Sequence, residues 1–375
     1  MRGVIAGALA LSGRAVEGWL RIDGETIAAA GRGRPPSRPT LRHDGLVAPG
    51  LCDVQVNGAA GVNVYEGPGA LDRIDAMQLA HGVTSYLPTV ISTDPETMAR
   101  AVSDIAERAA DPTSPVAGAH LEGPFLAKRF RGVHRADCLV SPASTRGRAA
   151  LAVYRDPAVR LVTLAPELPG ALDLVRSLAA RRPRVTVSLG HSGAAAEVAS
   201  EAVGRGARCV THLFNAMAPL HHREPGMPGW ALVDRRVRLG LIADGMHVAP
   251  PMLALVARAA AERVVLVTDA SPAAGAKPGR YEMAGAAIRS DADGRVTDFD
   301  GTLAGSSMTL DRAVRNWSEW TGVALPRAIA AASERPARLV GLPAGLRPGH
   351  PADLVLMSAG GQVERTMKRG AWVGG

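Results

Sequence analysis

The stretch "VSLGHSGAAAEVASEAVGRGARCVTHLFNAM" (187–217) decides the fold. Two short apolar runs of strand length flank an Ala-rich segment of helical composition. Each run delivers one histidine close to its carboxyl end: His191 follows the first run and His212 lies late in the second. Parallel strands present their carboxyl ends at one edge. The stretch therefore predicts a strand–helix–strand unit that brings both imidazoles to the same edge.

The same unit recurs along the chain. Continuous apolar runs, rather than alternating ones, are typical of parallel strands covered on both faces. Ala-rich helical segments separate them, and no Gly-rich GxGxxG motif follows the first run. Eight such repeats favour an α/β fold with a closed (β/α)8 TIM-like barrel over an open doubly wound sheet. The runs are 51–58, 84–90, 116–123, 159–167, 185–192, 209–217, 239–248 and 263–270.

The two chain ends do not follow this pattern. Residues 1–49 and 345–375 read as short strands, and we expect them to pair into one small β-domain, a β-sandwich formed by both termini. The barrel then occupies residues 50–344. Within it, "SDADGRVTDFDG" (290–301) has the turn signal of a polar hairpin.

Composition restricts the class of protein. The chain has 375 residues, 47% of them hydrophobic, and a net charge of +8. Arginines are scattered and the five Trp are dispersed, which argues against a nucleic-acid partner but suits an anionic small substrate. Three cysteines form no CxxC motif, which favours a reducing, cytoplasmic location. No apolar run reaches the roughly 20 residues of a membrane span, so no membrane partner is expected.

Four chemically active side chains fall at predicted strand ends. Glu122, His191 and Asp269 end the third, fifth and eighth runs, and His212 lies late in the sixth. Two imidazoles and a carboxylate are the protein ligands of a catalytic zinc-type site, whose fourth position is left for water. Asp269 is then free to act as general base. His120 has the same strand parity as Glu122, and we expect it to support the site rather than to be a ligand.

The motifs resemble those of the N-acetylglucosamine-6-phosphate deacetylase family of the amidohydrolase superfamily, over essentially the whole chain. The resemblance implies a distorted TIM barrel with a small β-sandwich. It also implies metal-dependent hydrolysis of the acetamide of N-acetyl-D-glucosamine 6-phosphate to D-glucosamine 6-phosphate and acetate, by a metal-activated water with an Asp general base and acid. The matching stretches, in order, are "PGLCDVQVNG", "HLEGPF", "GHS", "THLFNAM", "REPG", "IADGMHV", "LVTDA" and "GTLAGSSMTL".

By position, the resemblance makes Glu122, His191 and His212 the metal ligands and Asp269 the catalytic residue. It implies a homodimer in which the phosphate site is completed across the interface. The residues that it places at the substrate are Val133, His134, Asn215, Ala216, Arg223, His247, Leu303, Ala304 and Gly305, of which Arg223 and His247 would hold the phosphate.

The first-strand motif predicts how many metal ions bind. Many amidohydrolases carry HxH there and bind a second metal, whereas this chain has Gln55 and Asn57. Neutral amides are poor ligands for transition metals. We therefore expect one divalent ion per subunit, zinc in the first place, with iron or another divalent metal as alternatives.

Other functions stay open at this stage. A related amidohydrolase could deacetylate N-acetylgalactosamine 6-phosphate or another N-acyl substrate, because one inverted hydroxyl can be recognised by a single loop contact. Dihydroorotase-like and hydantoinase-like activities generally need the HxH pair that is missing here. A non-catalytic barrel kept as a binding module is an alternative of another class, and all four active side chains argue against it.

Overall fold

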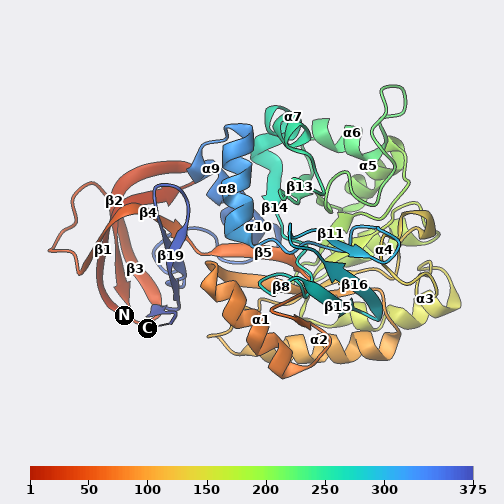
Figure 1. Ribbon diagram of the computed structural model, residues 1–375, viewed down its shortest axis with the longest axis horizontal. Helices are drawn as coiled ribbons and strands as arrows, with labels where there is room; N and C mark the ends of the chain where they lie inside the picture. The colour runs from red at the N-terminus through yellow and green to blue at the C-terminus, as the bar shows by residue number, and fades with distance from the viewer. Residues whose placement is uncertain (375) are drawn as a thin grey trace.

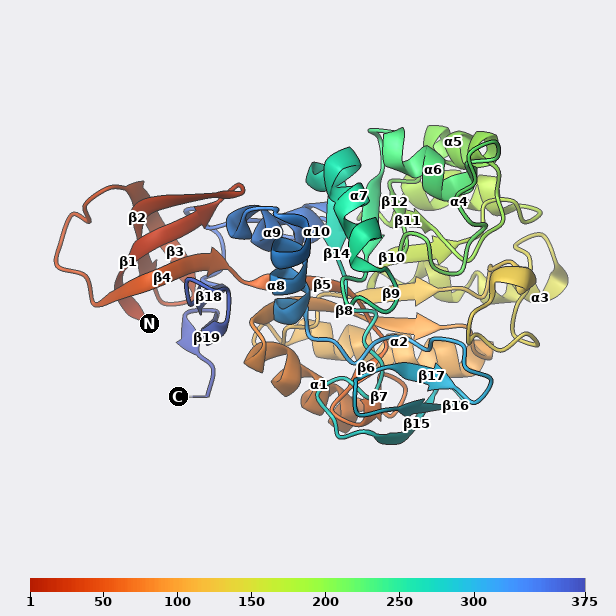
Figure 2. The same ribbon diagram turned by 45° about the horizontal axis from the view of Figure 1, so that its top comes forward.

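The computed structural model describes residues 1–374 and consists of two adjoining parts. A small β-sheet contains both chain ends, and a larger barrel with surrounding helices makes up the rest (Figure 1). The chain ends lie together at the outer side of the small sheet in both views (Figure 2), where the Met1 ammonium group donates to the Gly370 carbonyl at 2.6 Å.

The barrel contains the eight predicted strands. Each pairs in parallel with the next, and a bridge between Val56 and Ala270 joins the first strand to the segment after the last, which nearly closes the barrel. The (β/α)8 prediction is confirmed. The strands are β5 (Leu51–Val56), β8 (Val83–Ile91), β9 (Ala119–Glu122), β10 (Val159–Leu164), β11 (Thr186–Leu189), β12 (Cys209–Val210), β13 (Arg238–Leu241) and β14 (Val264–Leu266).

Helices cover the outside of the barrel, and α2 shows why they form. The Asp94 side chain accepts from the Thr97 N–H at 2.8 Å, Pro95 occupies the first turn, and apolar residues spaced from 98 to 105 face the core. The helices are α1 (Pro68–Ala80), α2 (Pro95–Ala110), α3 (Thr145–Ala150), α4 (Ala171–Ala179), α5 (Ala196–Arg205), α6 (Gly226–Val233), α7 (Pro250–Ala260), α8 (Leu310–Thr321), α9 (Leu325–Ala331) and α10 (Glu334–Leu339), with 3-10 turns at Lys128–Phe130, Val153–Arg155 and Ala261–Arg263.

The main core lies between strands and helices. Five of the six residues of β10 and all residues of β5, β9 and β11 are buried, as expected of parallel strands covered on both faces. Trp317, Tyr86 and Tyr154 are among the largest fully buried side chains. Within residues 1–374, the structure contains no helix with the length and apolarity that crossing a bilayer requires.

The small sheet has the order β20-β19-β18-β4-β1-β2-β3, so the last strands pair with the first ones, as predicted. It curls so that β3 meets residues 349–352, and its strands enclose an apolar core of their own. Its strands are β1 (Arg2–Leu11), β2 (Arg14–Asp23), β3 (Thr26–Arg32), β4 (Leu41–Pro49), β18 (Leu354–Met357), β19 (Val363–Lys368) and β20 (Ala371–Trp372).

Two smaller antiparallel sheets accompany the barrel. One pairs β6 (Gly58–Ala59) with β7 (Val62–Asn63), directly after the first barrel strand. The other consists of β15 (Gly279–Met283), β16 (Ala286–Ser290) and β17 (Val296–Asp298), so the predicted hairpin at 290–301 is confirmed. Met283 at the end of β15 reaches the cavity described below, which places this sheet beside the carboxyl ends of the barrel strands.

Candidate metal centre and substrate cavity

The four predicted active side chains meet at the carboxyl end of the barrel. Glu122 is the last residue of β9, while His191, His212 and Asp269 lie two to three residues beyond β11, β12 and β14. Glu122, His191 and His212 are each 5% exposed or less. The opening stretch thus brings its two imidazoles together because consecutive parallel strands end at the same edge.

Three ligand atoms converge on one point. The Glu122 Oε1 atom lies 3.3 Å from His191 Nε2 and 3.2 Å from His212 Nε2, and the two Nε2 atoms are 3.1 Å apart. Each Nδ1 faces a carbonyl oxygen: that of Phe130 for His191 at 2.8 Å, and that of Asn215 for His212 at 3.1 Å. A carbonyl only accepts, so each Nδ1 carries a proton and, in the neutral rings, both Nε2 lone pairs point at the carboxylate.

This arrangement requires a positive charge. The Glu122 carboxylate raises the pKa of the His212 imidazole, although burial opposes the effect. A metal ion satisfies the cluster better than a proton, because it is shared by all three atoms. Bonds of about 2.0–2.1 Å to a tetrahedral ion imply ligand atoms about 3.3 Å apart, which agrees with the observed 3.1–3.3 Å. The residues present therefore fit a single small divalent ion.

Gln55 and Asn57 lie beside the cluster as hydrogen-bond donors. The Gln55 amide donates to Glu122 Oε1 at 3.1 Å and to Asp269 Oδ1 at 3.1 Å. Asn57 donates to the same Asp269 oxygen at 2.8 Å. Burial, and then the charge of Glu122, raise the pKa of the Asp269 carboxyl. The nearby His212 and His247 and the hydrogen bond from Asn57 counteract this rise in pKa only in part. The two amides thus hold the carboxylates in place through their NH2 groups.

A cavity of about 320 Å³ opens above the cluster and contains most of the predicted substrate residues. Ala304 is fully buried just behind its wall, packed in an apolar cluster with Ile91 and Met283. Arg223 lies outside it. The predicted residues that line the cavity are Glu122, Val133, His134, His191, His212, Asn215, Ala216, His247, Asp269, Leu303 and Gly305.

His134 is prepared to donate a hydrogen bond. Burial, and then the neighbouring His191, lower its pKa to about 3, so the ring is neutral. Its Nδ1 atom accepts from the Ser92 N–H at 3.2 Å. The remaining proton therefore resides on Nε2, where it is available to a developing oxyanion.

His247 is held by a carboxylate. Its Nδ1 lies 2.6 Å from Asp244 Oδ2, and the other Asp244 oxygen accepts from the Met246 and His247 N–H groups at 2.8 Å each. These contacts with His247 keep the pKa of Asp244 below its ordinary value despite burial. The His247 ring is thus fixed at the cavity wall with its second nitrogen free for a ligand.

Two further predicted residues lie away from the cavity. Arg223 is exposed on the loop before α6, where its guanidinium contacts His222 Nε2 at 2.9 Å. His120 is not one of the three candidate ligands, and it bonds Thr163 at 2.8 Å and Thr89 at 3.3 Å. The expectation that His120 supports the site instead of binding the ion agrees with this placement.

The sequence reasoning missed several lining residues. The basic segment "LAKRFRGVH" (126–134) signals a cationic wall through Arg129, but Phe130, Ile91, Met217, Met283 and Thr302 carry no chemical signal. Backbone geometry was also unforeseen. Asp269, His191, His212 and Ala216 all have positive φ values, of 50°, 49°, 28° and 49°. Non-glycine residues rarely adopt this region, and such strain concentrates at functional sites.

The fold and the site together define a TIM-barrel protein with a buried Glu/His/His group suited to one metal ion. The amidohydrolase family model matches residues 46–373, and the chain belongs to this family. The chain is 38% identical to N-acetylgalactosamine-6-phosphate deacetylase of Escherichia coli O157:H7, over 94% of this chain and 95% of the relative. It is 39% identical to human N-acetylglucosamine-6-phosphate deacetylase, over 88% and 83%.

Solved structures agree with these relatives. A mutant of N-acetyl-D-glucosamine-6-phosphate deacetylase from Mycobacterium smegmatis, in complex with N-acetyl-D-glucosamine-6-phosphate, has a TM-score of 0.92 at 32% identity and 99% coverage of both chains. The corresponding enzyme from Pasteurella multocida has a TM-score of 0.90 at 29% identity, with 98% and 99% coverage.

Proposed function

We propose that this protein hydrolyses the acetamide of N-acetyl-D-glucosamine 6-phosphate to D-glucosamine 6-phosphate and acetate. One observation carries the proposal: Glu122, His191 and His212 converge at one cavity, which is also lined by most of the residues predicted to bind the sugar. Asp269 lies in the same cavity, and the Gln55 amide donates to both Glu122 and Asp269. The names and ligands of the relatives support the same substrate.

The metal is proposed to be one zinc ion per subunit, held by Glu122, His191 and His212, with iron or another divalent ion as alternatives. When bound, such an ion supplies Lewis-acid chemistry: it polarises a carbonyl and lowers the pKa of water. The orientation of Gln55 and Asn57 as donors toward the carboxylates supports a single ion.

The chain's own residues then perform the proton transfers. Asp269 accepts a proton from the attacking water and returns it to the amine nitrogen, so one carboxylate serves both steps. The Nε2 proton of His134 stabilises the developing oxyanion. His247, held by Asp244, binds the phosphate and anchors the non-reacting end of the substrate.

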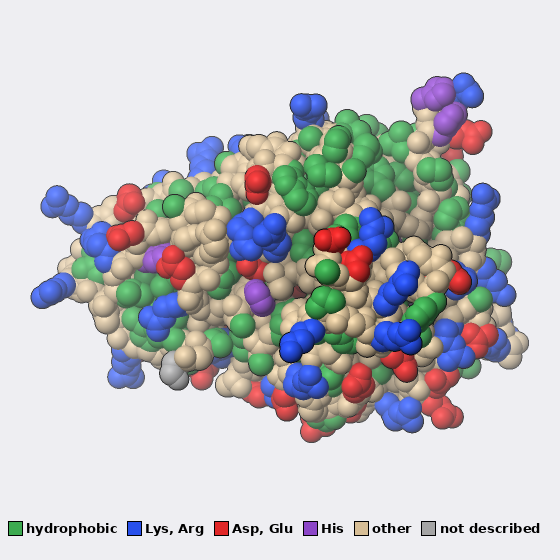
Figure 3. All heavy atoms as spheres, in the orientation of Figure 1, with side chains coloured by type: hydrophobic (Ala, Val, Ile, Leu, Met, Phe, Trp, Pro, Cys, Tyr) green, Lys and Arg blue, Asp and Glu red, His purple; other side chains and the backbone are tan. Residues whose placement is uncertain are grey.

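Arg223 is proposed to reach the phosphate of a second subunit. It is exposed and lies outside the cavity of its own chain. Leu220 on the same loop, Val233 on α6 and Leu255 on α7 are 43%, 75% and 43% exposed, and Figure 3 shows apolar side chains gathered over α6 and α7. An exposed apolar face of this kind suits contact with another copy. We therefore infer a homodimer whose interface completes the phosphate site.

Two further assignments accompany the proposal. Residues 1–49 and 345–375 are proposed as one domain and residues 50–344 as the catalytic domain, which is supported by the shared strands of the terminal sheet. The proposed location is the cytoplasm: Cys52, Cys138 and Cys209 are buried and unpaired, which fits a reducing compartment.

N-acetylgalactosamine 6-phosphate is a second candidate substrate. The match to the Escherichia coli relative named for this epimer covers 95% of that relative's length, whereas the match to the human relative covers 83% of its length. The two sugars differ by one inverted hydroxyl, so the cavity, phosphate contacts and chemistry serve both.

The test is acetate release by the zinc-loaded protein from four sugars: N-acetylglucosamine and N-acetylgalactosamine, each with and without the 6-phosphate. The proposal expects the highest kcat/KM for N-acetylglucosamine 6-phosphate and poor turnover of both free sugars. Preference for the galactosamine ester would select the second candidate. Absence of acetate from all four, with zinc bound, would contradict both and leave a binding module.

A further inference from the structure

A second cavity, of about 490 Å³, lies between the small sheet and the barrel. Its walls include Thr84 at the start of β8, Gly118 just before β9 and Arg160 at the start of β10. These are the amino ends of the strands, whereas the metal ligands lie at the carboxyl ends. The second cavity is therefore at the opposite end of the barrel from the candidate active site.

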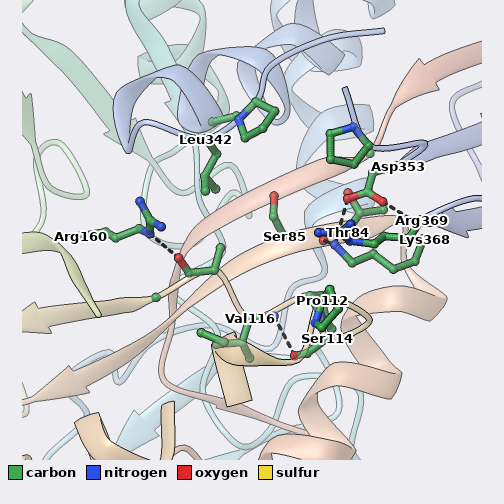
Figure 4. A pocket seen from close by; sticks show the side chains of 18 of the residues that line it. Thr84, Ser85, Pro112, Ser114, Val116, Arg160, Leu342, Asp353, Lys368 and Arg369 are labelled. Atoms are coloured by element: carbon green, nitrogen blue, oxygen red, sulfur yellow. Dashed lines mark hydrogen bonds and ion pairs between the residues drawn. The ribbon is translucent and has the colours of Figure 1, made fainter. Parts of the chain in front are cut away.

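Most charged side chains around this cavity are paired within the protein. Asp353 lies 2.9 Å from Lys368, Arg369 lies 2.9 Å from Glu25, and Asp111 lies 3.6 Å from Arg108. Figure 4 shows Asp353, Lys368 and Arg369 together on one wall. Because each of these charged groups already has an oppositely charged partner, none of them needs a bound ligand to neutralise its charge.

Arg160 differs from the others. It stands on the opposite wall in Figure 4, and no carboxylate among residues 1–374 lies within ion-pair distance of its guanidinium. Its Nε donates to the Ala117 carbonyl at 2.5 Å, while Nη1 and Nη2 have no acceptor in that described range. Partial burial lowers the pKa of its guanidinium. A partly desolvated guanidinium without a carboxylate partner gains from contact with an oxyanion.

The local backbone makes room for this side chain. Gly118 has φ of +129°, and a Cβ there would lie 2.8 Å from Arg160 Cγ. Between the two charged walls, the lining is mainly apolar or small and includes Val116, Leu342 and Ser85 (Figure 4). The volume falls within the range of small-molecule sites, about 300–1,000 Å³.

We propose that this interdomain cavity binds a small organic anion, with its carboxylate or phosphate group on Arg160 and a compact apolar body against Val116 and Leu342. Planar guanidinium groups bind both kinds of oxyanion through paired N–H donors. Since the cavity is lined by both parts of the chain, the bound anion stabilises their association. This site is independent of the proposed deacetylase reaction.

The test compares the native protein with Arg160→Gln and with Arg155→Gln, an exposed arginine outside the cavity that serves as the matched control. Gln at position 160 keeps a donor for the Ala117 carbonyl but removes the charge. Melting temperature is measured on metal-loaded protein with increasing benzoate or phenyl phosphate. The proposal expects a saturable rise of a few degrees in the native protein and in Arg155→Gln, and its loss in Arg160→Gln. The more effective probe identifies the oxyanion.

Equal shifts in all three proteins, or no shift with either probe, would overturn the proposal. The ligand-free proteins give a second readout. If the unpaired guanidinium of Arg160 serves to bind a ligand, its removal should not destabilise the ligand-free protein. The melting temperature of Arg160→Gln should then equal or exceed that of the native protein. A drop of several degrees in ligand-free Arg160→Gln, absent in Arg155→Gln, would show that Arg160 has a structural role only. Acetate release is expected to stay unchanged in both variants.

Discussion

Replacing Asp269 with Asn should abolish most of the turnover while leaving the metal in place. The structure explains why the substitution is so specific. Gln55 and Asn57 both donate to Asp269 Oδ1, at 3.1 and 2.8 Å. In the Asn variant, these donors select the orientation in which the amide oxygen accepts from them. The amide NH2 then replaces Oδ2, which converts a proton acceptor into a donor.

The magnitude follows from the two proton transfers assigned to this carboxylate. General acid–base catalysis contributes about 10²–10⁴-fold, and both steps use Asp269. We expect kcat to fall by about 10³–10⁴, which corresponds to about 4–5.5 kcal/mol of transition-state free energy. KM and the zinc content should change little, because Asp269 is not among the three ligand residues.

Steady-state acetate release, combined with elemental analysis of zinc, measures both effects. Asp244→Asn is the matched control: it should raise KM through the loosened His247 and leave kcat nearly intact. An Asp269→Asn enzyme that keeps more than about a tenth of native kcat would refute the assigned role, since general base catalysis predicts a far larger loss.

Three further variants test other parts of the account. Arg223→Ala should raise KM for the 6-phosphate sugar about 10- to 100-fold, the loss of one charge-assisted contact, and leave the free sugar unaffected; equal losses for both sugars would show that Arg223 does not bind phosphate. The two carboxylate oxygens of Glu167 accept from Ser192 Oγ and Gly193 N, each at 2.7 Å, and Glu167→Gln removes one of these acceptors. The free energy of unfolding, measured by thermal unfolding, should fall by about 1 kcal/mol, and zinc binding beside His191 should weaken. Burial alone would raise the pKa of Asp311, but the contacts with His81 and Arg315 hold it well below its ordinary value. The free energy of unfolding of Asp311→Asn should therefore be about 2 kcal/mol lower than that of the native protein at neutral pH. This stability difference should shrink as the pH falls below about 3.9, the pKa of Asp in the unfolded state. Urea unfolding at several pH values measures it, and a difference that does not change with pH would contradict the role assigned to the Asp311 charge.

Local sequence patterns were sufficient for the barrel and for the group of four side chains that meet at its carboxyl end. Continuous apolar runs mark strands buried on both faces, and their carboxyl ends must share an edge in any parallel barrel. That reasoning places Glu122, His191, His212 and Asp269 together without knowledge of any distance. Likewise, the strands at both chain ends could be assigned to one sheet because neither end follows the strand–helix repeat.

Other features depend on distances that no pattern encodes. Gln55 and Asn57 could be recognised as poor ligands, but their donation to Glu122 and Asp269 follows only from the close approach of β5, β9 and β14. The lining role of Met283 depends on how β15 folds back over the barrel end. The unpaired state of Arg160 is equally unpredictable, since 43 basic residues are scattered along the sequence and only packing decides which one lacks a carboxylate.

The central claim is that Glu122, His191 and His212 share one cation. Anomalous diffraction at the zinc edge, from crystals of the zinc-loaded protein, tests this claim most directly. We expect a single peak within about 2.0–2.2 Å of the Glu122 carboxylate and both Nε2 atoms. A peak elsewhere, no peak, or a second peak of equal height beside Gln55 and Asn57 would contradict it.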